Sequence, residues 1–173
     1  MNVPASLDRP HAGLLEWLER HEVEHDIHEH AEAFTARGTA RAQGVDPRTF
    51  AKVVGVVTDD GRTVFLVVDA SDRVDLHKAR RALAADDVRL LTEGELATLA
   101  PDCQVGAMPA VGELFGVPTV ADYAVRDDAE LSFDAGSHRY SVRVDRAAWE
   151  RAAGVTYADL AEETDAGPAW ARS

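Results

Sequence analysis

The chain has 173 residues, of which 31 are acidic and 18 are basic, so its net charge is −13. This length suits one domain, and 46% hydrophobic residues is ordinary for a globular protein. The negative charge excludes the class of proteins that bind long stretches of nucleic acid through many phosphate contacts. We therefore expect no DNA partner and only a small, local contact with any RNA.

The N-terminal part begins with residues 1–10, which are polar and contain proline. We expect a flexible arm there, followed by a single folded domain over residues 11–163. The spacing of Leu14, Leu15 and Leu18 predicts an amphipathic helix at the start of this domain.

A weakly alternating stretch, residues 23–30, leads to a second predicted helix. Thr35 can cap this helix at its N-terminus, and Gly44 ends it. Strand-like character therefore precedes a helix rich in small residues.

Two apolar runs, Val53–Val57 and Val64–Val68, flank a turn that contains Asp60 and Gly61. Asp-Gly between β-branched runs is the strongest short-range signal for a hairpin. The two runs therefore predict a central antiparallel pair of strands.

Capping residues mark the next two helices. Asp75 can cap a helix that runs to Leu83. Thr92, with Glu95 three residues later, forms a capping box for a helix that ends near Pro101.

The C-terminal half alternates between strands and helices. We expect short strands at residues 88–91, 116–120, 130–133 and 140–144 and a helix at residues 145–154. Thr156 and Asp159 form a second capping box, which predicts a last helix. Residues 164–173 are expected to be a disordered tail.

The single cysteine, Cys103, cannot form an internal disulfide. The sequence contains no secretion signal pattern and no apolar run of about 18 residues. We therefore expect a cytoplasmic protein without a membrane segment. The sequence also lacks a P-loop, a GxGxxG motif and paired cysteines, so no nucleotide cofactor is indicated.

Lys52 is the only lysine in the first 77 residues, and it opens the apolar run that ends at Val57. An ammonium at the mouth of a buried strand is costly unless an anion or a polar ligand compensates it. Lys52 is thus a candidate binding group. The alternative is a packed stem with its ammonium in water.

Three histidines, His25, His28 and His30, lie within six residues, and imidazole is the commonest metal ligand. In a strand, however, His28 and His30 share one face and His25 points to the other. A polar edge strand is the alternative to a metal site, and we favour it.

Cys103 is a candidate nucleophile only if a base lies within hydrogen-bond reach and the thiol is activated. The residues around it supply no fixed cation, which favours a small packed thiol. A basic cluster at residues 73–81 is either a solvated helix face or a contact for a few phosphates.

Two glycine-containing loops are candidate sites for a carbonyl or an oxyanion. The first runs from Gly106 through Pro109 to Gly112, and the second from Gly136 to His138. Glycines let backbone N–H groups point at a ligand. The same loops can also be simple turns.

Taken in order, these pieces resemble the YbaK/EbsC family of free-standing aminoacyl-tRNA deacylases, which is related to the editing domain of prolyl-tRNA synthetase. The resemblance covers roughly residues 10–160. The pieces that carry it are His30-Ala-Glu-Ala-Phe34-Thr35-Ala, Ala51-Lys52-Val-Val, Asp75-Leu76-His-Lys78, Gly106-Ala-Met-Pro109 and Asp134-Ala-Gly136-Ser137-His138.

The resemblance implies a mixed α+β fold with a central, largely antiparallel sheet flanked by helices. It also implies a pocket for the 3′-terminal adenosine of a mischarged tRNA and its aminoacyl group. The residues that match the family's motifs are Lys52, Gly106, Gly136 and His138 as catalytic groups, and Thr35, Lys52, Ala107, Met108, Pro109 and Ser137 as substrate-binding groups.

The implied reaction is hydrolysis of an aminoacyl ester, which needs a positioned water and a polarised carbonyl but no metal or cofactor. The amino acid removed is expected to be small, such as alanine, cysteine or serine, on a tRNA for proline. A synthetase is a candidate partner. The alternatives are a non-catalytic binding module for an amino acid, an adenosine-like ligand or a synthetase, and a metallohydrolase built on the histidines.

Overall fold

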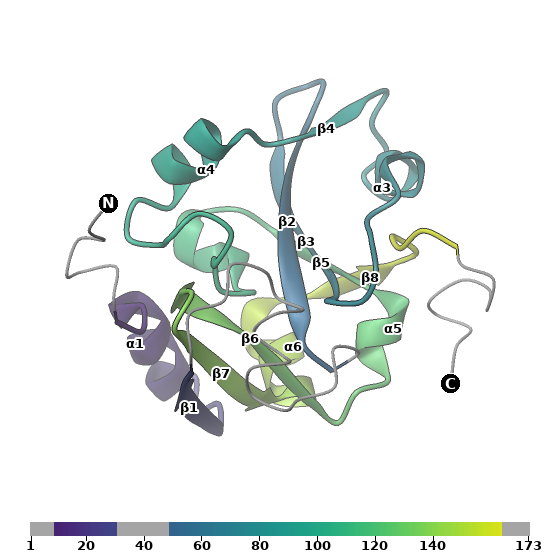
Figure 1. Cartoon of the computed structure of the whole chain (residues 1–173). Coiled ribbons are helices and arrows are strands. Elements are labelled where there is room, and N and C mark those ends of the chain that lie inside the picture. Colours follow the sequence, from purple (N-terminus) through teal and green to yellow (C-terminus); the bar gives the residue numbers. More distant parts are fainter. Residues whose placement is uncertain (1–8, 31–48, 164–173) are drawn as a thin grey trace.

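The computed structural model describes residues 9–30 and 49–163, which form two sheets surrounded by helices (Figure 1). Thr35, the helix predicted to end at Gly44, most of the N-terminal arm and the tail at 164–173 lie outside the described residues. The mixed α+β class expected from the sequence is confirmed.

The larger sheet has five strands in the order β4-β2-β3-β5-β8. They are β2 (Ala51–Thr58), β3 (Thr63–Asp69), β4 (Val88–Leu90), β5 (Thr119–Asp122) and β8 (Thr156–Ala158). The predicted hairpin is confirmed as the antiparallel pair β2–β3, and β4 also pairs with β2 antiparallel. The pairs β3–β5 and β5–β8 are parallel.

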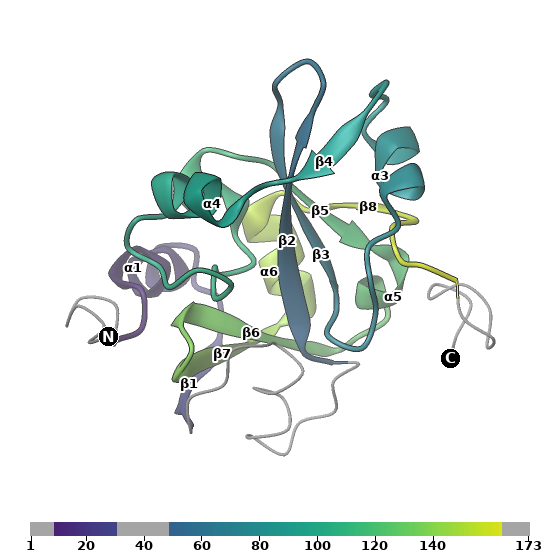
Figure 2. The same ribbon diagram turned by 45° about the horizontal axis from the view of Figure 1, so that its top comes forward.

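The smaller sheet is antiparallel throughout and has the order β1-β7-β6. Its strands are β1 (His25–Glu29), β6 (Glu130–Ser137) and β7 (Tyr140–Asp145). A bridge between Phe50 and Ser132 brings β6 beside the beginning of β2 (Figure 2). The two sheets thus meet where β2 begins.

The helices are α1 (Ala12–Arg20), α3 (Leu76–Ala82), α4 (Glu93–Leu99), α5 (Tyr123–Arg126) and α6 (Arg146–Ala153), with a 3-10 helix, η2, at Gly112–Phe115. The side chain of Asp75 accepts hydrogen bonds from the backbone at the start of α3, and the capping box of Thr92 and Glu95 is present at α4. These two predicted caps are confirmed.

The capping box predicted at Thr156 and Asp159 is wrong, because residues 156–158 form β8 instead of opening a helix. Thr156 and Tyr157 are β-formers, and β5 offers its edge to them in a parallel pairing. A tertiary partner therefore overrides the local helix signal.

Two further predictions at the C-terminal side need correction. The strand expected at residues 116–120 begins only at Thr119, because Gly116 ends η2 in a left-handed conformation with φ of 73°. The glycine loop expected to follow Phe133 is instead the end of β6, which continues to Ser137 through a β-bulge after Asp134. The short helix α5 has no counterpart in the predicted elements.

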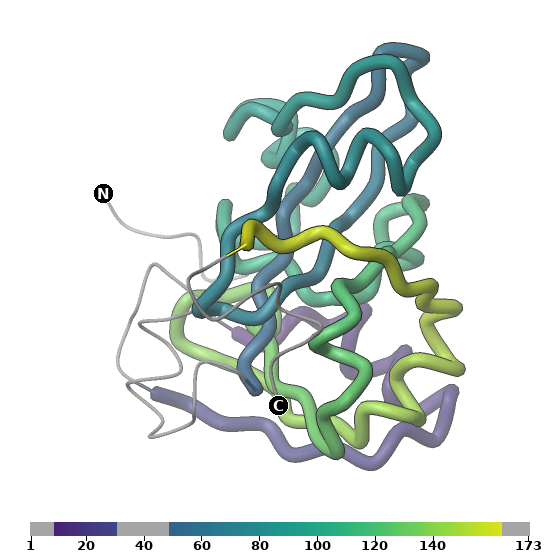
Figure 3. The backbone as a smooth tube through the Cα atoms, turned by 90° about the vertical axis from the view of Figure 1, so that its right-hand side faces the viewer, coloured from purple at the N-terminus to yellow at the C-terminus, as the bar shows by residue number. Residues whose placement is uncertain are grey.

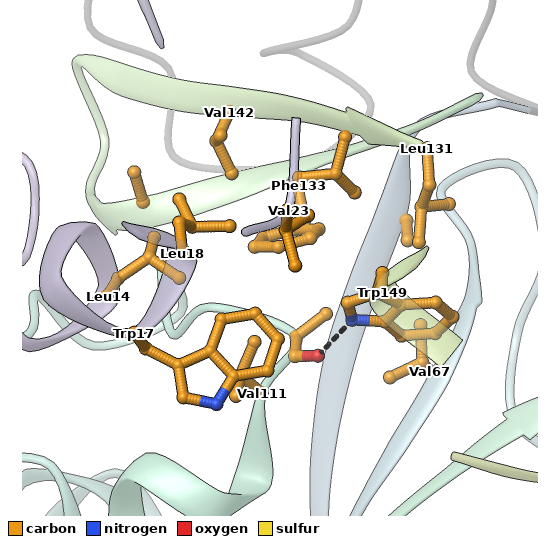
Figure 4. Close-up of a cluster of buried hydrophobic side chains, with 14 of the residues drawn as sticks. Leu14, Trp17, Leu18, Val23, Val67, Val111, Leu131, Phe133, Val142 and Trp149 are labelled. Carbon is orange, nitrogen blue, oxygen red and sulfur yellow. Dashed lines mark hydrogen bonds between the residues drawn. The ribbon is translucent and has the colours of Figure 1, made fainter. Parts of the chain in front are cut away.

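The main core lies between α1, α6, the smaller sheet and one face of β2 and β3 (Figure 4). Trp17, Phe133 and Trp149 are its largest fully buried side chains. The indole N–H of Trp149 donates to the carbonyl oxygen of Ala110 at 2.7 Å, so α6 holds the loop that precedes η2.

Two smaller clusters cover the two faces of the five-stranded sheet. On one face, Val56 and Val68 pack against Ala79 of α3 and against Leu83, which directly follows α3. On the other face, Phe65 and Val53 pack against the segment that follows α4. Alternate residues of β2 therefore serve different clusters.

The segment after β8 returns to the beginning of α3 (Figure 3). The carboxylate of Asp122, which is 0% exposed, accepts hydrogen bonds from the amides of Leu160, Ala161 and Ala124 at 2.8, 3.0 and 3.0 Å. Further along, the amide of Glu162 donates to the carbonyl oxygen of Arg73 at 2.8 Å. This buried carboxylate therefore anchors the C-terminal segment to β5 and α5.

In residues 9–30 and 49–163, no helix is long and apolar enough to cross a membrane.

Candidate active site

The first glycine loop connects α4 to η2 and turns inward at Gly106. Gly106 has a φ of 86° and is exposed, whereas Ala107, Met108 and Pro109 after it are buried. Met108 packs in the cluster beneath α4. A positive φ is the conformation that glycine adopts at no steric cost, so Gly106 lets the chain change from surface to core within one residue.

The second glycine loop, the bulge at the end of β6, is hydrogen-bonded directly to the first. The amide of Gly136 donates to the carbonyl oxygen of Ala107 at 2.9 Å, and the amide of Gln104 donates to the carbonyl oxygen of Gly136 at 2.9 Å. Residues about 30 apart in sequence thus form one unit. We call residues 104–109 together with 136–138 the loop–turn unit.

His138, at the end of the turn, contacts the first loop through both its ring and its backbone amide. The residue is 5% exposed, and its Nε2 lies 2.9 Å from the carbonyl oxygen of Val105. Because a carbonyl only accepts, Nε2 carries the proton in this contact. The amide of His138 donates to Oε1 of Gln104 at 2.6 Å. His138 therefore fixes the position of the loop backbone.

The two glycine amides are placed differently. The Gly136 amide is already used by Ala107, which the sequence did not indicate. Gly106 is exposed, and among residues 9–30 and 49–163 its N–H has no acceptor. Of the two amides expected to bind a carbonyl, the amide of Gly106 is therefore the one that the described residues leave without an acceptor, and it belongs to an exposed residue.

Gly136 cannot accept a side chain without strain. Its φ is 89°, and a Cβ there would lie 2.9 Å from Cβ of His11 and 3.4 Å from Sγ of Cys103. Gly61 in the β2–β3 turn has a similar φ of 87°, but a Cβ there would meet nothing within 4 Å. The two glycines therefore have nearly the same positive φ, but only Gly136 lacks space for a side chain.

Gly136→Ala is expected to lower the free energy of unfolding more than Gly61→Ala does. The positive φ costs about 1–2 kcal/mol at either position, and the contact with His11 adds about 1–3 kcal/mol at Gly136. Chemical denaturation of both variants measures the difference. Equal losses would mean that the space behind Gly136 is not tightly filled.

Lys52 is half-buried near the beginning of β2. Burial lowers the pKa of its ammonium below the usual value, an effect that Asp72 opposes and that the positive charge of Arg73 increases. Glu162 is a further neighbouring charge. Lys52 thus stands among charges from the segment after β3 and from the C-terminal segment.

The orientation of Lys52 follows from the register of the hairpin. Lys52 lies opposite Val68 and shares a face of the sheet with it, and Val68 packs in the cluster beneath α3. The next residue, Val53, packs in the cluster that contains Met108. The structure therefore brings Gly106, Gly136 and His138 together but directs Lys52 to the other face of β2.

The basic residues of the cluster at 73–81 differ in burial and in their contacts. Lys78 is buried, and its Nζ donates to Oδ1 of Asp159 at 3.1 Å and to the carbonyl oxygen of Ala161 at 2.8 Å. Lys78 is therefore a structural residue. Arg73 and Arg81 are exposed, and Arg81 borders a cavity of about 340 Å³ beside α3.

Of the three histidines that are candidate metal ligands, His25 and His28 lie in β1 and His30 directly follows it. His25 contacts the carbonyl oxygen of Val23 through Nδ1 at 2.8 Å. In the part of the chain that the structure describes, no group of three or more His, Cys, Asp or Glu side chains is arranged to hold a metal ion.

Cys103 is packed against the loop–turn unit and is 4% exposed. Burial raises the pKa of its thiol to about 12, and the negative charge of Asp102 acts in the same direction. A nucleophilic cysteine needs a lowered pKa, so these surroundings favour the packed thiol over the nucleophile.

Sequence reasoning missed the residues that support the unit from behind, which are His11, Asp102 and Gln104. Gln104 and His138 are 34 residues apart, and His11 and Asp102 are 91 residues apart. No spacing rule joins positions so far apart. His11 also caps α1, although histidine is not among the favoured N-cap residues.

Solved structures share this fold. A candidate trans-editing enzyme for prolyl-tRNA synthetase has a TM-score of 0.77 at 23% identity, covering 93% of this chain and 99% of the other. A scaffold protein from a study of epitope grafting has a TM-score of 0.77 at 23% identity, covering 94% of this chain and all of the other. A protein described as a signal transduction protein from Marinobacter aquaeolei VT8 has a TM-score of 0.68 at 16% identity, and the match covers 94% of this chain and 31% of that one.

No curated protein matches the chain. The family model for the aminoacyl-tRNA editing domain matches residues 30–152, more than half of the 173 residues. This match includes Lys52, the loop–turn unit and every strand of the two sheets except β1 and β8, and it confirms the resemblance seen in the sequence. The chain belongs to the aminoacyl-tRNA editing domain family.

Proposed function

We propose that this protein hydrolyses the ester of a mischarged aminoacyl-tRNA and that the loop–turn unit binds the reacting carbonyl. The observation that carries the proposal is that Gly106 and Gly136 belong to one hydrogen-bonded unit in which Gly106 is exposed and its amide has no acceptor among the described residues. Membership of the editing family supports the same class of reaction.

In the proposed reaction, the oxygen of a water molecule attacks the carbonyl carbon of the ester. The bond to the ribose oxygen then breaks, and this oxygen takes up a proton that the water has lost, so the products are a free amino acid and a tRNA with an intact 3′-terminal hydroxyl. A backbone N–H placed at the carbonyl oxygen stabilises the negative charge that develops there. The Gly106 amide supplies this donor, and His138 keeps the loop in place through Val105.

Lys52 has a separate role in the proposal, because it lies on the face of β2 that Val68 occupies. Its ammonium binds a phosphate or the ribose at the 3′ end of the tRNA. Arg73, whose charge acts on Lys52, is a second cation at this place. A contact restricted to the acceptor end needs few phosphates, which agrees with a net charge of −13.

The amino acid removed is proposed to be small, such as alanine, cysteine or serine, and the tRNA to be that for proline. By their match to the family's motifs, the proposed substrate contacts are Ala107, Met108, Pro109 and Ser137, all of which are buried in this structure. Thr35, which lies outside the described residues, belongs to the same set. One methylene is worth about 1–3 kcal/mol of discrimination, so a few side chains decide the specificity. A synthetase partner and a cytoplasmic location belong to the same proposal.

A non-catalytic binding module is the second candidate. It is favoured by the internal hydrogen bonds of the Gly136 amide and of Nε2 of His138, since groups used within the fold are not available to act on a water. Such a module would bind an aminoacyl-adenosine without cleaving it.

Two analogues of the tRNA end separate these candidates. We expect release of alanine from 3′-alanyl-adenosine, in which the link is an ester, and binding without cleavage of the analogue in which the link is an amide. Hydrolysis should continue when a chelator is present. Binding of both analogues with no release from the ester would favour the binding module, and loss of release with the chelator would favour a metallohydrolase.

A further inference from the structure

His11 lies directly behind the loop–turn unit and has no part in the proposed chemistry. It precedes α1, and its amide donates to the carbonyl oxygen of Ala135 at 2.7 Å, one residue before Gly136. The residue is 7% exposed. The start of α1 is thus joined to the bulge of β6 through the backbone of His11.

The contacts of the ring determine which nitrogen carries its proton. Nδ1 accepts a hydrogen bond from the amide of Leu14 at 3.0 Å, so Nδ1 is unprotonated. Nε2 lies 3.2 Å from Oδ2 of Asp102, and a carboxylate only accepts, so Nε2 donates. The ring is therefore a bridge between the N-terminus of α1 and the segment before the Gly106 loop.

The ring also fills the space behind the glycine of the turn. A Cβ on Gly136 would lie 2.9 Å from Cβ and 3.6 Å from Cγ of His11. The ring of Phe115 in η2 packs edge-on against it, with 5.7 Å between centroids. His11 thus contacts the turn, the segment before the loop and the helix after the loop.

This arrangement constrains the two halves of the loop–turn unit together. Asp102 precedes Cys103 and Gln104, and the amide of Gln104 donates to the carbonyl oxygen of Gly136. A shift of Asp102 would move this donor, and a shift of the ring would move Gly136. A displacement of about 1 Å at a reacting group can reduce the rate by about 100-fold, so small movements here matter.

We infer that His11 and Asp102 are positioning residues for this site. Their hydrogen bond sets the position of the Gly106 loop relative to the Gly136 turn, while neither residue touches the substrate. The inference rests on the proposed ester hydrolysis for its kinetic consequence, but the position of the two glycines can be measured without activity.

Asp102→Ala tests the inference with little risk to folding, because this side chain is 67% exposed. We expect kcat for ester hydrolysis to fall about three- to tenfold, with KM within about twofold, because the loop moves while substrate contacts remain. The amide resonances of Gly106 and Gly136 should shift in the NMR spectrum. Asp127→Ala, which removes an exposed carboxylate at the end of α5, should change neither quantity.

His11→Asn completes the experiment. Asparagine is a favoured N-cap, so α1 keeps a cap while the partner of Asp102 is lost. Adding Asp102→Ala to this variant should cause no further fall in kcat, because the two changes remove one interaction.

An unchanged kcat in Asp102→Ala would overturn the inference and leave His11 as a cap of α1 alone. Additive losses in the double variant would overturn it as well. If the parent protein cleaves no ester, the proposed function fails. The positioning role is then tested by the NMR spectrum of Asp102→Ala alone. Unmoved resonances of Gly106 and Gly136 would then reject the positioning role, and displaced ones would support it.

Discussion

Lys52→Ala is expected to reduce kcat/KM for deacylation of a mischarged tRNA by about 10- to 100-fold. The reason is the loss of a hydrogen bond from a charged donor, worth about 1.5–3 kcal/mol. Because Lys52 lies on the face of β2 away from Met108, we expect most of this loss in KM. If Lys52 binds a phosphate, the dependence of log KM on log salt should weaken by about one unit.

Two variants control this experiment. Lys52→Arg keeps the positive charge and should retain part of the activity. Arg81→Ala removes an exposed positive charge from α3 and should change kcat/KM by less than about threefold, since exposed charges contribute little. An equal loss in Arg81→Ala would mean that general charge attracts the tRNA, and full activity in Lys52→Ala would remove Lys52 from the site.

The composition of the chain offers a direct measurement of the same contact. Lys52 and Lys78 are the only lysines, and Lys78 is 7% exposed and paired with Asp159. An amine-acylating reagent should therefore modify Lys52 in preference to Lys78. Bound tRNA should protect Lys52, and modification at an unchanged rate would contradict the proposed contact.

Asp122→Ala is expected to have the largest effect on stability, lowering the free energy of unfolding by about 3–5 kcal/mol. Three backbone amides donate to this fully buried carboxylate, and its removal leaves them without an acceptor. Each unsatisfied buried group costs about 1–3 kcal/mol. Denaturant unfolding gives the value.

Asp122→Asn is the matched control for this change. Its amide oxygen replaces one carboxylate oxygen, so it can accept from Leu160 and Ala161 but not also from Ala124. We expect about half of the loss seen for alanine. If alanine costs less than about 1 kcal/mol, the C-terminal segment is held by other contacts and Asp122 is not its anchor.

Local signals in the sequence predicted most of the elements. Asp60-Gly61 predicted the hairpin. The N-termini of α3 and α4 were predicted from Asp75 and from the pair Thr92 and Glu95, respectively. These signals depend on residues within four positions of one another, which is the range over which caps and turns act. The helix predicted at Thr156 is wrong because the structure of this segment depends on its pairing with β5, more than 30 residues earlier.

The sequence predicted which residues belong to the candidate site but not how they contact one another. The resemblance selected Gly106, Gly136 and His138, and the structure joins them through the backbone of Ala107 and Val105. Sequence could not show that the amide of Gly136 is used within the fold. This depends on two loops meeting, which no local pattern records.

Lys52 illustrates the same limit. Its place before an apolar run indicated a costly ammonium, and burial does lower its pKa. Its neighbours Asp72 and Glu162 come from segments 20 and 110 positions later in the chain. The face of the sheet that it occupies follows from the strand register, which the hairpin turn sets.

The measurement that tests the central claim most directly is release of amino acid from a panel of mischarged tRNAs. The panel should contain alanyl, cysteinyl and seryl esters of the tRNA for proline beside the correctly charged tRNAs, each with the parent protein and with Lys52→Ala. We predict rapid release from at least one mischarged ester, no release from correctly charged tRNA, and a strongly reduced rate in the variant. Survival of every ester at high protein concentration would contradict the account.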